Sequence, residues 1–450
     1  MTIQSQLVMI AWIPIVFYLF IRFKTQEAVI ISFIVAWLFL PQKAGFSFPG
    51  LPDYERMSAT VYGILLATII YDVQRITKFN YHWLDIPMTI WCISPFFSSV
   101  TNGLGAYDGL SSSLFQTVSY GGPYFLGRIY LGNLTGMRKL AIGILLGGLA
   151  YVPFCLYEIR FSPQLHNKIY GYHAHSFAQT VRFGGFRPTV FMEHGLAVGM
   201  WMMAASLIGL WLWKTRVVDY IFGIHIKWWV GILVTTFILS RSTGAYGLLV
   251  IGIAILFSAW QFRTSLSLLV LIAAMVFYLQ QNVSTSSNLS ENIINTLDSV
   301  VPAERIQSLE YRFENEELLK EKAQERIVFG WGGWNRNRVY DYDRQGNLVD
   351  ITTVDSLWII AFGRNGLVGL ISLFSSILIP ANLFALQYFP GRTWSNIKVA
   401  PAAVVVVVVT LYMLDCLIND MPNPIFILAI GGISGLLVEA SLPNRIARST

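Results

Sequence analysis

Long apolar runs separated by short polar stretches repeat along almost the whole chain. Apolar runs of about 20 residues are typical of helices that cross a lipid bilayer. About thirteen runs approach that length, at residues 6–23, 28–41, 57–71, 83–100, 114–131, 140–157, 190–213, 228–239, 245–260, 266–279, 367–389, 399–417 and 425–438. The short runs at 28–41 and 228–239 can instead be re-entrant, which would change the number of crossings.

The composition agrees with this pattern. The chain has 450 residues, of which 55% are hydrophobic and 12% charged, and its mean hydropathy is +0.56. These values exclude an ordinary soluble domain and predict an all-α polytopic membrane protein with a large, partly helical loop. In such a protein the net charge of +6 indicates contact with anionic lipids and not with nucleic acid. Cys92, Cys155 and Cys416 all lie in apolar segments, so no disulfide framework is expected.

The basic residues predict the sidedness of the loops, because loops rich in Lys and Arg face the cytoplasm. The basic loops carry Arg22 and Lys24, Arg75 and Lys78, Arg138 and Lys139, Lys214, Arg216 and Lys227, Arg263, Arg392 and Lys398, and Arg445 and Arg448. Their alternation predicts an outside N-terminus, an inside C-terminus, and two outer loops at 160–188 and 282–354. No signal peptide is expected, because no basic residue precedes the first apolar run.

We therefore divide the chain into three parts. Residues 1–280 are a transmembrane region that includes the outer loop 160–188, residues 281–355 are a periplasmic loop, and residues 356–450 are a second transmembrane region. Within the periplasmic loop, Pro302 and Glu304 suit the first turn of a helix. That helix should run to about Arg326 and end before Gly330, lying over the membrane with one face packed on the spans.

Three arginines, Arg182, Arg187 and Arg241, stand at the mouths of very hydrophobic spans on the predicted outer face. A charge at the centre of a span costs roughly 2.5–3.5 kcal/mol by insertion scales, and less near its ends, so such residues usually serve a site. Guanidinium groups pair well with phosphate, which indicates a pyrophosphate or carboxylate ligand. Arg241 can alternatively extend its charge to the interface, but no acidic residue adjoins it.

Acidic residues, a histidine and an asparagine lie in the same predicted regions as these arginines. Glu193 and His194 are predicted one to two turns inside the helix 190–213, as functional groups or as a structural ion pair with an arginine. Asp355 precedes the next span, where it can cap the helix or serve as a functional carboxylate. Asp415 lies in an apolar span with Asn419 one turn later, where it can anchor an arginine.

Two other polar features have simpler interpretations. Residues His173 and His175 have no carboxylate or Cys nearby in the sequence to complete a metal site, so no metal is predicted. Arg128 lies near the inner end of its span, and its charge is expected to reach the interface.

The order of these motifs resembles the O-antigen ligase and O-antigen polymerase superfamily of bacterial membrane glycosyltransferases. The resemblance is carried by Arg182-Phe-Gly-Gly-Phe-Arg-Pro188, Ser240-Arg-Ser-Thr-Gly244, Phe329-Gly-Trp-Gly-Gly333, Asp355-Ser-Leu-Trp358, Gly363-Arg-Asn-Gly366 and Asp415 with Asn419. It implies the C-type glycosyltransferase fold, with many spans and a large periplasmic loop. It also implies a reaction, in which a glycan moves from a polyprenyl-diphosphate carrier to an acceptor hydroxyl without a cofactor.

The resemblance also implies roles for individual residues. Arg182 and Arg241 match the arginines that contact the pyrophosphate in the family, whereas Arg187 stands where relatives often have another polar residue. Asp415 matches the late-span aspartate. Asp355 departs from the family, because relatives often place a His there, so the identity of a general base stays open among Asp355, Glu193 and His194. The implied setting is the inner membrane, with a glycan or lipid as acceptor and membrane lipids around the chain.

Two rival functions remain from the sequence. A transporter or flippase for an anionic lipid-linked sugar would use the arginines for binding alone, and it should show internal repeats with interrupted helix pairs. No internal repeat is visible in the chain. A polysaccharide-assembly protein with a degenerate site is the other rival, which the departure at Asp355 keeps open.

Overall fold

The computed structural model describes residues 2–48, 52–182, 184–284 and 303–442. Within them, 7 helices are long and apolar enough to cross a membrane. These helices are α1 (Ile3–Arg22), α8 (Leu134–Phe161), α10 (Gly195–Lys214), α12 (Thr243–Phe262), α13 (Leu266–Ser284), α16 (Leu357–Leu383) and α18 (Pro424–Ser441). The prediction of an all-α polytopic membrane protein is confirmed, whereas the count of about thirteen crossings and the division into three parts stay predictions.

Shorter elements complete the bundle. Four shorter apolar helices are described, α2 (Thr25–Phe39), α3 (Arg56–Tyr71), α11 (Ile226–Leu239) and α17 (Ala400–Asp415). The remaining α-helices are α4 (Val73–Thr77), α5 (Ile86–Thr101), α6 (Ala106–Gln116), α7 (Gly122–Leu131), α9 (Leu165–Tyr170) and α15 (Ala303–Gln324). A π-helical turn at Thr117–Gly121 joins α6 to α7, and single helical turns occur at Trp83–Asp85, Phe177–Thr180, Phe384–Tyr388 and Gly391–Thr393. The strands form four short antiparallel pairs, β1 (Gly45–Phe46) with β2 (Tyr54–Glu55), β3 (Val181–Arg182) with β4 (Gly185–Phe186), β5 (Tyr220–Ile221) with β6 (Ile224–His225), and β7 (Tyr340–Tyr342) with β8 (Leu348–Asp350).

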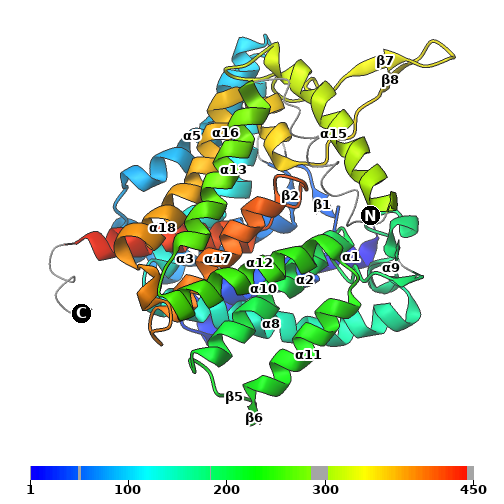
Figure 1. Cartoon of the computed structure of the whole chain (residues 1–450). Coiled ribbons are helices and arrows are strands. Elements are labelled where there is room, and N and C mark those ends of the chain that lie inside the picture. Colours follow the sequence, from blue (N-terminus) through cyan, green and yellow to red (C-terminus); the bar gives the residue numbers. More distant parts are fainter. Residues whose placement is uncertain (1, 49–51, 183, 285–302, 443–450) are drawn as a thin grey trace.

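Helices α10 and α17 form the centre of the bundle (Figure 1). The valine run 404–409 of α17 is at most 1% exposed. Because this part of α17 is buried on all sides, it needs no polar face. In contrast, α13 lies at the periphery, and much of its surface is free to face lipid.

Helix α16 is interrupted at Gly366, where φ is 62° and ψ is −161°. Residues 327–332 fill the interruption. The backbone N–H groups of Trp331 and Gly332 donate to the carbonyls of Gly363 and Arg364 at 2.8 and 2.9 Å. Beyond the break, Leu367 and Val368 donate to the carbonyls of Ile327 and Val328 at 2.8 and 3.2 Å. Non-helical backbone at membrane depth is tolerated only where such groups are paired, so the break and this segment form one unit.

Helix α15 confirms the predicted helix of the long loop, although Pro302 lies outside the described residues. It packs beside α16, and the β7–β8 hairpin projects away from the body of the molecule (Figure 1). Asn315 accepts a hydrogen bond from the Thr353 N–H at 2.8 Å, and the Tyr311 and Thr353 hydroxyls are 3.0 Å apart. We call the end of the bundle against which α15 lies the α15 face.

One predicted charge has a different environment. Arg128 is buried, and its Nε and Nη2 donate to the two carboxylate oxygens of Asp85 at 2.7 and 3.0 Å. The prediction that it extends to the interface is therefore wrong. Asp85, which is 43 residues away in the sequence, accepts hydrogen bonds from the guanidinium inside the protein.

Candidate functional site

The β3–β4 pair positions Arg182 and Arg187. Gly184 lies between the strands with φ of +69°, a conformation that glycine adopts without steric cost. The Arg187 N–H donates to the Thr180 carbonyl at 2.7 Å, which extends the pairing by one residue. The chain then leaves the pair at Pro188.

Arg241 lies in the tight turn between α11 and α12 and is itself in the left-handed region, with φ of 55°. Its Nη1 donates to the Arg182 carbonyl at 2.7 Å. Its guanidinium also lies against Gly185, where an added Cβ would come within 2.4 Å of the Arg241 Cζ. A left-handed arginine is uncommon, and such backbone strain tends to occur at functional sites.

The Arg187 side chain reaches the same turn. It is 5% exposed, and its Nη2 donates to the Ser242 hydroxyl at 2.9 Å. The structure thus brings the Arg187 and Arg241 side chains to one turn, with the backbone of Arg182 against Arg241, although Arg241 follows the other two by more than fifty residues.

The segment after Pro188 is held by residues that the sequence did not single out. The buried Glu158 carboxylate accepts hydrogen bonds from the N–H groups of Leu165, Thr189 and Val190 at 2.9, 2.8 and 2.7 Å. The Gln42 amide donates to the Phe191 carbonyl at 2.7 Å. These contacts keep residues 189–191 out of a helix, and Val190 has a φ of 53°.

As a consequence, the predicted helix 190–213 begins only at Gly195 as α10. The prediction that Glu193 and His194 lie inside this helix is wrong, because both residues precede it. Glu193 is half-exposed and lies 3.3 Å from the Lys43 ammonium. Its described ion pair is therefore with a lysine and not with one of the three arginines.

His194 is the N-cap of α10. Its Nδ1 accepts a hydrogen bond from the Leu196 N–H at 3.1 Å, so its Nε2 carries the proton and donates to the Gln179 side-chain oxygen at 3.0 Å. Burial and the charge of Arg187 lower the pKa of His194 to about 3. The imidazole is therefore neutral at physiological pH, with both nitrogens engaged.

This geometry predicts that His194 acts through the cap and not through proton transfer. Replacement by Asn, a strong N-cap residue, is expected to retain most of the wild-type activity, whereas Leu should destabilise the protein by about 0.5–2 kcal/mol. Activity and thermal unfolding of the two purified variants would test this. An Asn variant that folds normally but is inactive would show that the imidazole takes part in the chemistry.

Asp355 is not the N-cap of α16, since that position belongs to Ser356. The Asp355 carboxylate lies 3.8 Å from Arg312 Nε of α15, and its side chain is 42% exposed. The Ser356 hydroxyl donates to Glu316 of α15 and leaves the helix end uncapped by a side chain. Two side chains of α15 thus meet the start of α16.

Asp415 and Asn419 lie close to Arg312. The Asn419 amide donates to Asp415 Oδ1 at 2.8 Å, and the Asn419 side-chain oxygen accepts from Arg312 Nη1 at 3.5 Å. The charges of Arg312 and Arg187 both act on Asp415. Asp415 therefore connects the arginines around the α11–α12 turn with the α15 contacts.

Glu316 is a second carboxyl of α15 with an unusual environment. Burial raises its pKa to about 7, although hydrogen bonds from Ser356 and Trp358 oppose the shift. Arg312 and Glu316 are four residues apart and lie on one face of the helix. The spacing of these two residues can be recognised from the sequence, but it does not indicate which residues this face of α15 contacts.

Two more charged residues at the α15 face were missed. Arg364 lies at the break in α16, and Asp420 lies in the loop between α17 and α18. The charges of Arg364, Glu193 and Asp355 all act on Asp420. No group of three or more metal-ligating side chains gathers in the described ranges.

A family model described as O-antigen ligase matches residues 228–374 of the chain. Over these residues the chain is similar to the O-antigen ligase family. A search of curated proteins found no match to the chain.

The O-antigen ligase match covers about a third of the chain, from α11 through the break in α16. Arg241, Arg312, Asp355 and Arg364 lie within it, whereas Arg182, Arg187 and Asp415 lie outside. The match confirms the predicted superfamily and supports, in general terms, a membrane glycosyltransferase of the O-antigen ligase and polymerase type.

Proposed function

We infer that this chain transfers a glycan from a polyprenyl-diphosphate carrier to an acceptor hydroxyl at the α15 face, and that this face is periplasmic in a bacterial inner membrane. The observation that carries the proposal is the convergence of Arg182, Arg187 and Arg241 around the α11–α12 turn. The carboxylates Asp355 and Asp415 lie on the same face, linked to one another through Arg312 and Asn419.

The arginines suit the donor half of the reaction. As the bond from the sugar to the diphosphate breaks, negative charge grows on the leaving oxygens. Fixed cations near those oxygens stabilise that charge, and such preorganised electrostatics is usually the largest contribution to catalysis. An activated lipid-linked donor also supplies the energy for transfer without ATP, and no ATP-binding motif is present in the sequence.

The carboxylates suit the acceptor half. A carboxylate near the attacking hydroxyl can accept its proton if geometry and pKa allow. The positive charge of Arg312 near Asp355 would lessen the repulsion between this carboxylate and a bound diphosphate. The proposal covers ligases and polymerases alike, because both share this reaction and differ in the acceptor.

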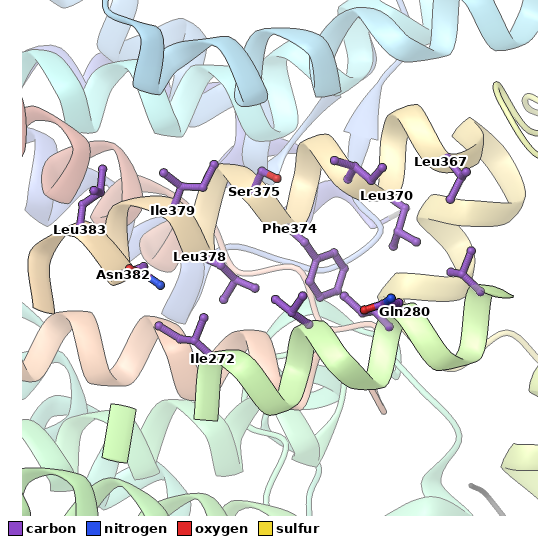
Figure 2. A pocket seen from close by; sticks show the side chains of 14 residues that line it. Ile272, Gln280, Leu367, Leu370, Phe374, Ser375, Leu378, Ile379, Asn382 and Leu383 are labelled. Carbon is purple, nitrogen blue, oxygen red and sulfur yellow. The ribbon is translucent and has the colours of Figure 1, made fainter. Parts of the chain in front are cut away.

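An apolar groove between α13 and α16 suits the carrier's hydrocarbon chain (Figure 2). Its volume is about 710 Å³, and it is lined mainly by aliphatic side chains, among them Ile272, Leu370, Leu378 and Ile379. Both helices are candidate membrane spans, so a lipid chain is the natural occupant. Near the outer end of the groove, Tyr278 of α13 meets Trp358, three residues after Asp355, with ring centroids 6.4 Å apart.

Filling this groove tests the proposal. Ser375 is a small residue that lines it, so Ser375→Phe should occupy part of the volume. In liposomes, we expect the variant to raise the KM for a long-chain polyprenyl-diphosphate glycan at least several-fold, because buried apolar contact is lost. The KM for a short-chain analogue should hardly change.

The matched control is Gly247→Phe on α12, where an added side chain meets open space. It should leave both KM values near those of the wild type. Equal effects of Ser375→Phe on long and short donors would exclude the groove as the binding site of the carrier's hydrocarbon chain. No transfer by the wild-type protein would exclude the proposed function itself.

The interruption of α16 is the one observation that favours a transporter, since transporters use broken helices at their binding sites. In this chain, however, the groups freed by the break pair with residues 327–332 of the protein itself. The break is thus closed by the chain's own backbone, which favours a fixed catalytic framework over a moving substrate site.

A further inference from the structure

The loop between α17 and α18 is held firmly at the α15 face. The Leu357 N–H donates to the carbonyls of Cys416 and Asn419 at 3.1 and 3.3 Å. At the other end of the loop, the Asn423 N–H donates to the Tyr412 hydroxyl at 3.2 Å, and Asn423 caps α18 through the Ile425 N–H at 2.9 Å. Asp420 lies between these anchors, so its position is fixed by the framework.

Asp420 is distinguished from every other described carboxylate by an unused oxygen. Its Oδ1 is buried and has no hydrogen-bond partner, and it is the only carboxylate oxygen in this state across the described ranges. Leaving a buried acceptor unpaired destabilises a protein, and a charged group does so more than a neutral one. Such an unpaired buried group calls for an explanation, and a catalytic role is one of those known.

Three other carboxylates of the site are already engaged. Glu193 pairs with Lys43 and is half-exposed. Asp355 faces Arg312 and is 42% exposed. Asp415 accepts a hydrogen bond from Asn419. Each of these contacts would have to be given up, or to lose strength, before the carboxylate could take a proton from a substrate.

We propose that Asp420 is the group that accepts the proton of the acceptor hydroxyl. The inference rests on the proposed function and names the base within the same site. In the step, the acceptor oxygen forms a bond to the anomeric carbon while the bond from that carbon to the diphosphate oxygen breaks. The hydroxyl proton moves to the Asp420 carboxylate, and the polyprenyl diphosphate leaves with the bonding electron pair.

The charges around Asp420 suit this role. Burial raises the pKa of Asp420 to about 6, the charge of Arg364 opposes that shift, and the charges of Glu193 and Asp355 add to it. Tyr120 and Cys416 are further titratable groups within electrostatic range of Asp420. The carboxylate is therefore mostly ionised at neutral pH, yet more basic than an ordinary aspartate, and a base poised near the working pH is the efficient one.

Asp420→Asn tests the proposal in the full-length protein, reconstituted with a polyprenyl-diphosphate glycan and its acceptor. We expect transfer to fall by at least roughly 100-fold, as for the loss of a general base, while donor KM and thermal unfolding stay near wild type. The wild-type rate should decline as pH falls through about 6, because Asp420 becomes protonated. That decline should be absent from the residual activity of the Asn variant.

Two further variants keep the test decisive. Asp420→Glu retains a carboxylate and should retain the decline near pH 6 at a reduced rate, even if Asn disturbs the loop. Asp219→Asn, at an exposed position outside the site, should match the wild type. Wild-type transfer with an equally active Asp420→Asn variant would overturn the role of Asp420 alone. No transfer by the wild type would overturn the proposed function and this role with it.

Discussion

Replacing Arg241 with alanine is expected to lower glycan transfer by roughly 100- to 1000-fold, the range found when one preorganised donor to a developing anion is removed. The guanidinium holds the Arg182 carbonyl and lies over Gly185, so its loss removes charge and loosens the β3–β4 pair. Arg241→Lys should rescue poorly, because an ammonium lacks the planar fork that binds two phosphate oxygens at once. Transfer rates of the purified variants would provide the measurement.

Arg241→Gln separates the two roles of this side chain. An amide can still donate a hydrogen bond toward the Arg182 carbonyl, but it carries no charge. We expect the Gln variant to unfold at a temperature close to the wild type and to transfer as slowly as the Ala variant. Arg344→Ala, at an exposed position between β7 and β8, is the matched control and should be fully active. Full activity of Arg241→Ala would remove Arg241 from the donor site.

The second large effect is expected at Gly366. Its φ and ψ of 62° and −161° lie in a region that only glycine adopts freely, and an added Cβ would lie 2.3 Å from the Val328 carbonyl oxygen. Gly366→Ala should therefore destabilise the protein by about 1–3 kcal/mol through backbone strain, and by more through displacement of residues 327–332. Transfer should fall as well, because Arg364 borders the break. Thermal unfolding in detergent and the transfer rate measure these two effects.

Gly333 offers a matched control in the segment that follows. Its φ is not positive, and an added Cβ would meet open space. Gly333→Ala should unfold at nearly the wild-type temperature. If Gly366→Ala also unfolded at that temperature, α16 could not be interrupted as described.

Local features of the sequence predicted several parts of this fold well. The apolar runs include the 7 helices that are long and apolar enough to cross a membrane, and helical periodicity with a proline and an acid at its start located α15. The three arginines were expected on one face, and the structure brings them around a single turn. In each case the signal lies within one segment, either as a hydrophobic period or as a charge at the end of a span.

The predictions failed where contacts between distant residues decide the outcome. Helix α10 begins at Gly195 because Glu158, at the end of another helix, takes the N–H groups of Thr189 and Val190. Arg128 is buried because Asp85 receives it. Neither partner can be identified from hydrophobic periodicity, because each lies on a different element.

The break in α16 illustrates the same limit. The glycines at 363 and 366 and the segment 329–333 were both noted as motifs, yet nothing local indicated that they pair with one another. Asp420 was overlooked because its significance depends on its Oδ1 having no partner, which only a three-dimensional arrangement reveals.

We propose that the cluster of arginines and carboxylates at the α15 face breaks a glycosyl–diphosphate bond and does not merely bind or move its substrate. The most direct measurement is the stoichiometry of the reaction in sealed proteoliposomes that contain the purified protein and a radiolabelled polyprenyl-diphosphate glycan, with acceptor supplied to the α15 face. We predict one molecule of polyprenyl diphosphate released for each new glycosidic bond, with both products falling together by roughly 100- to 1000-fold in the Arg241→Ala variant. Movement of the intact lipid-linked glycan across the bilayer, with no diphosphate released, would contradict the account.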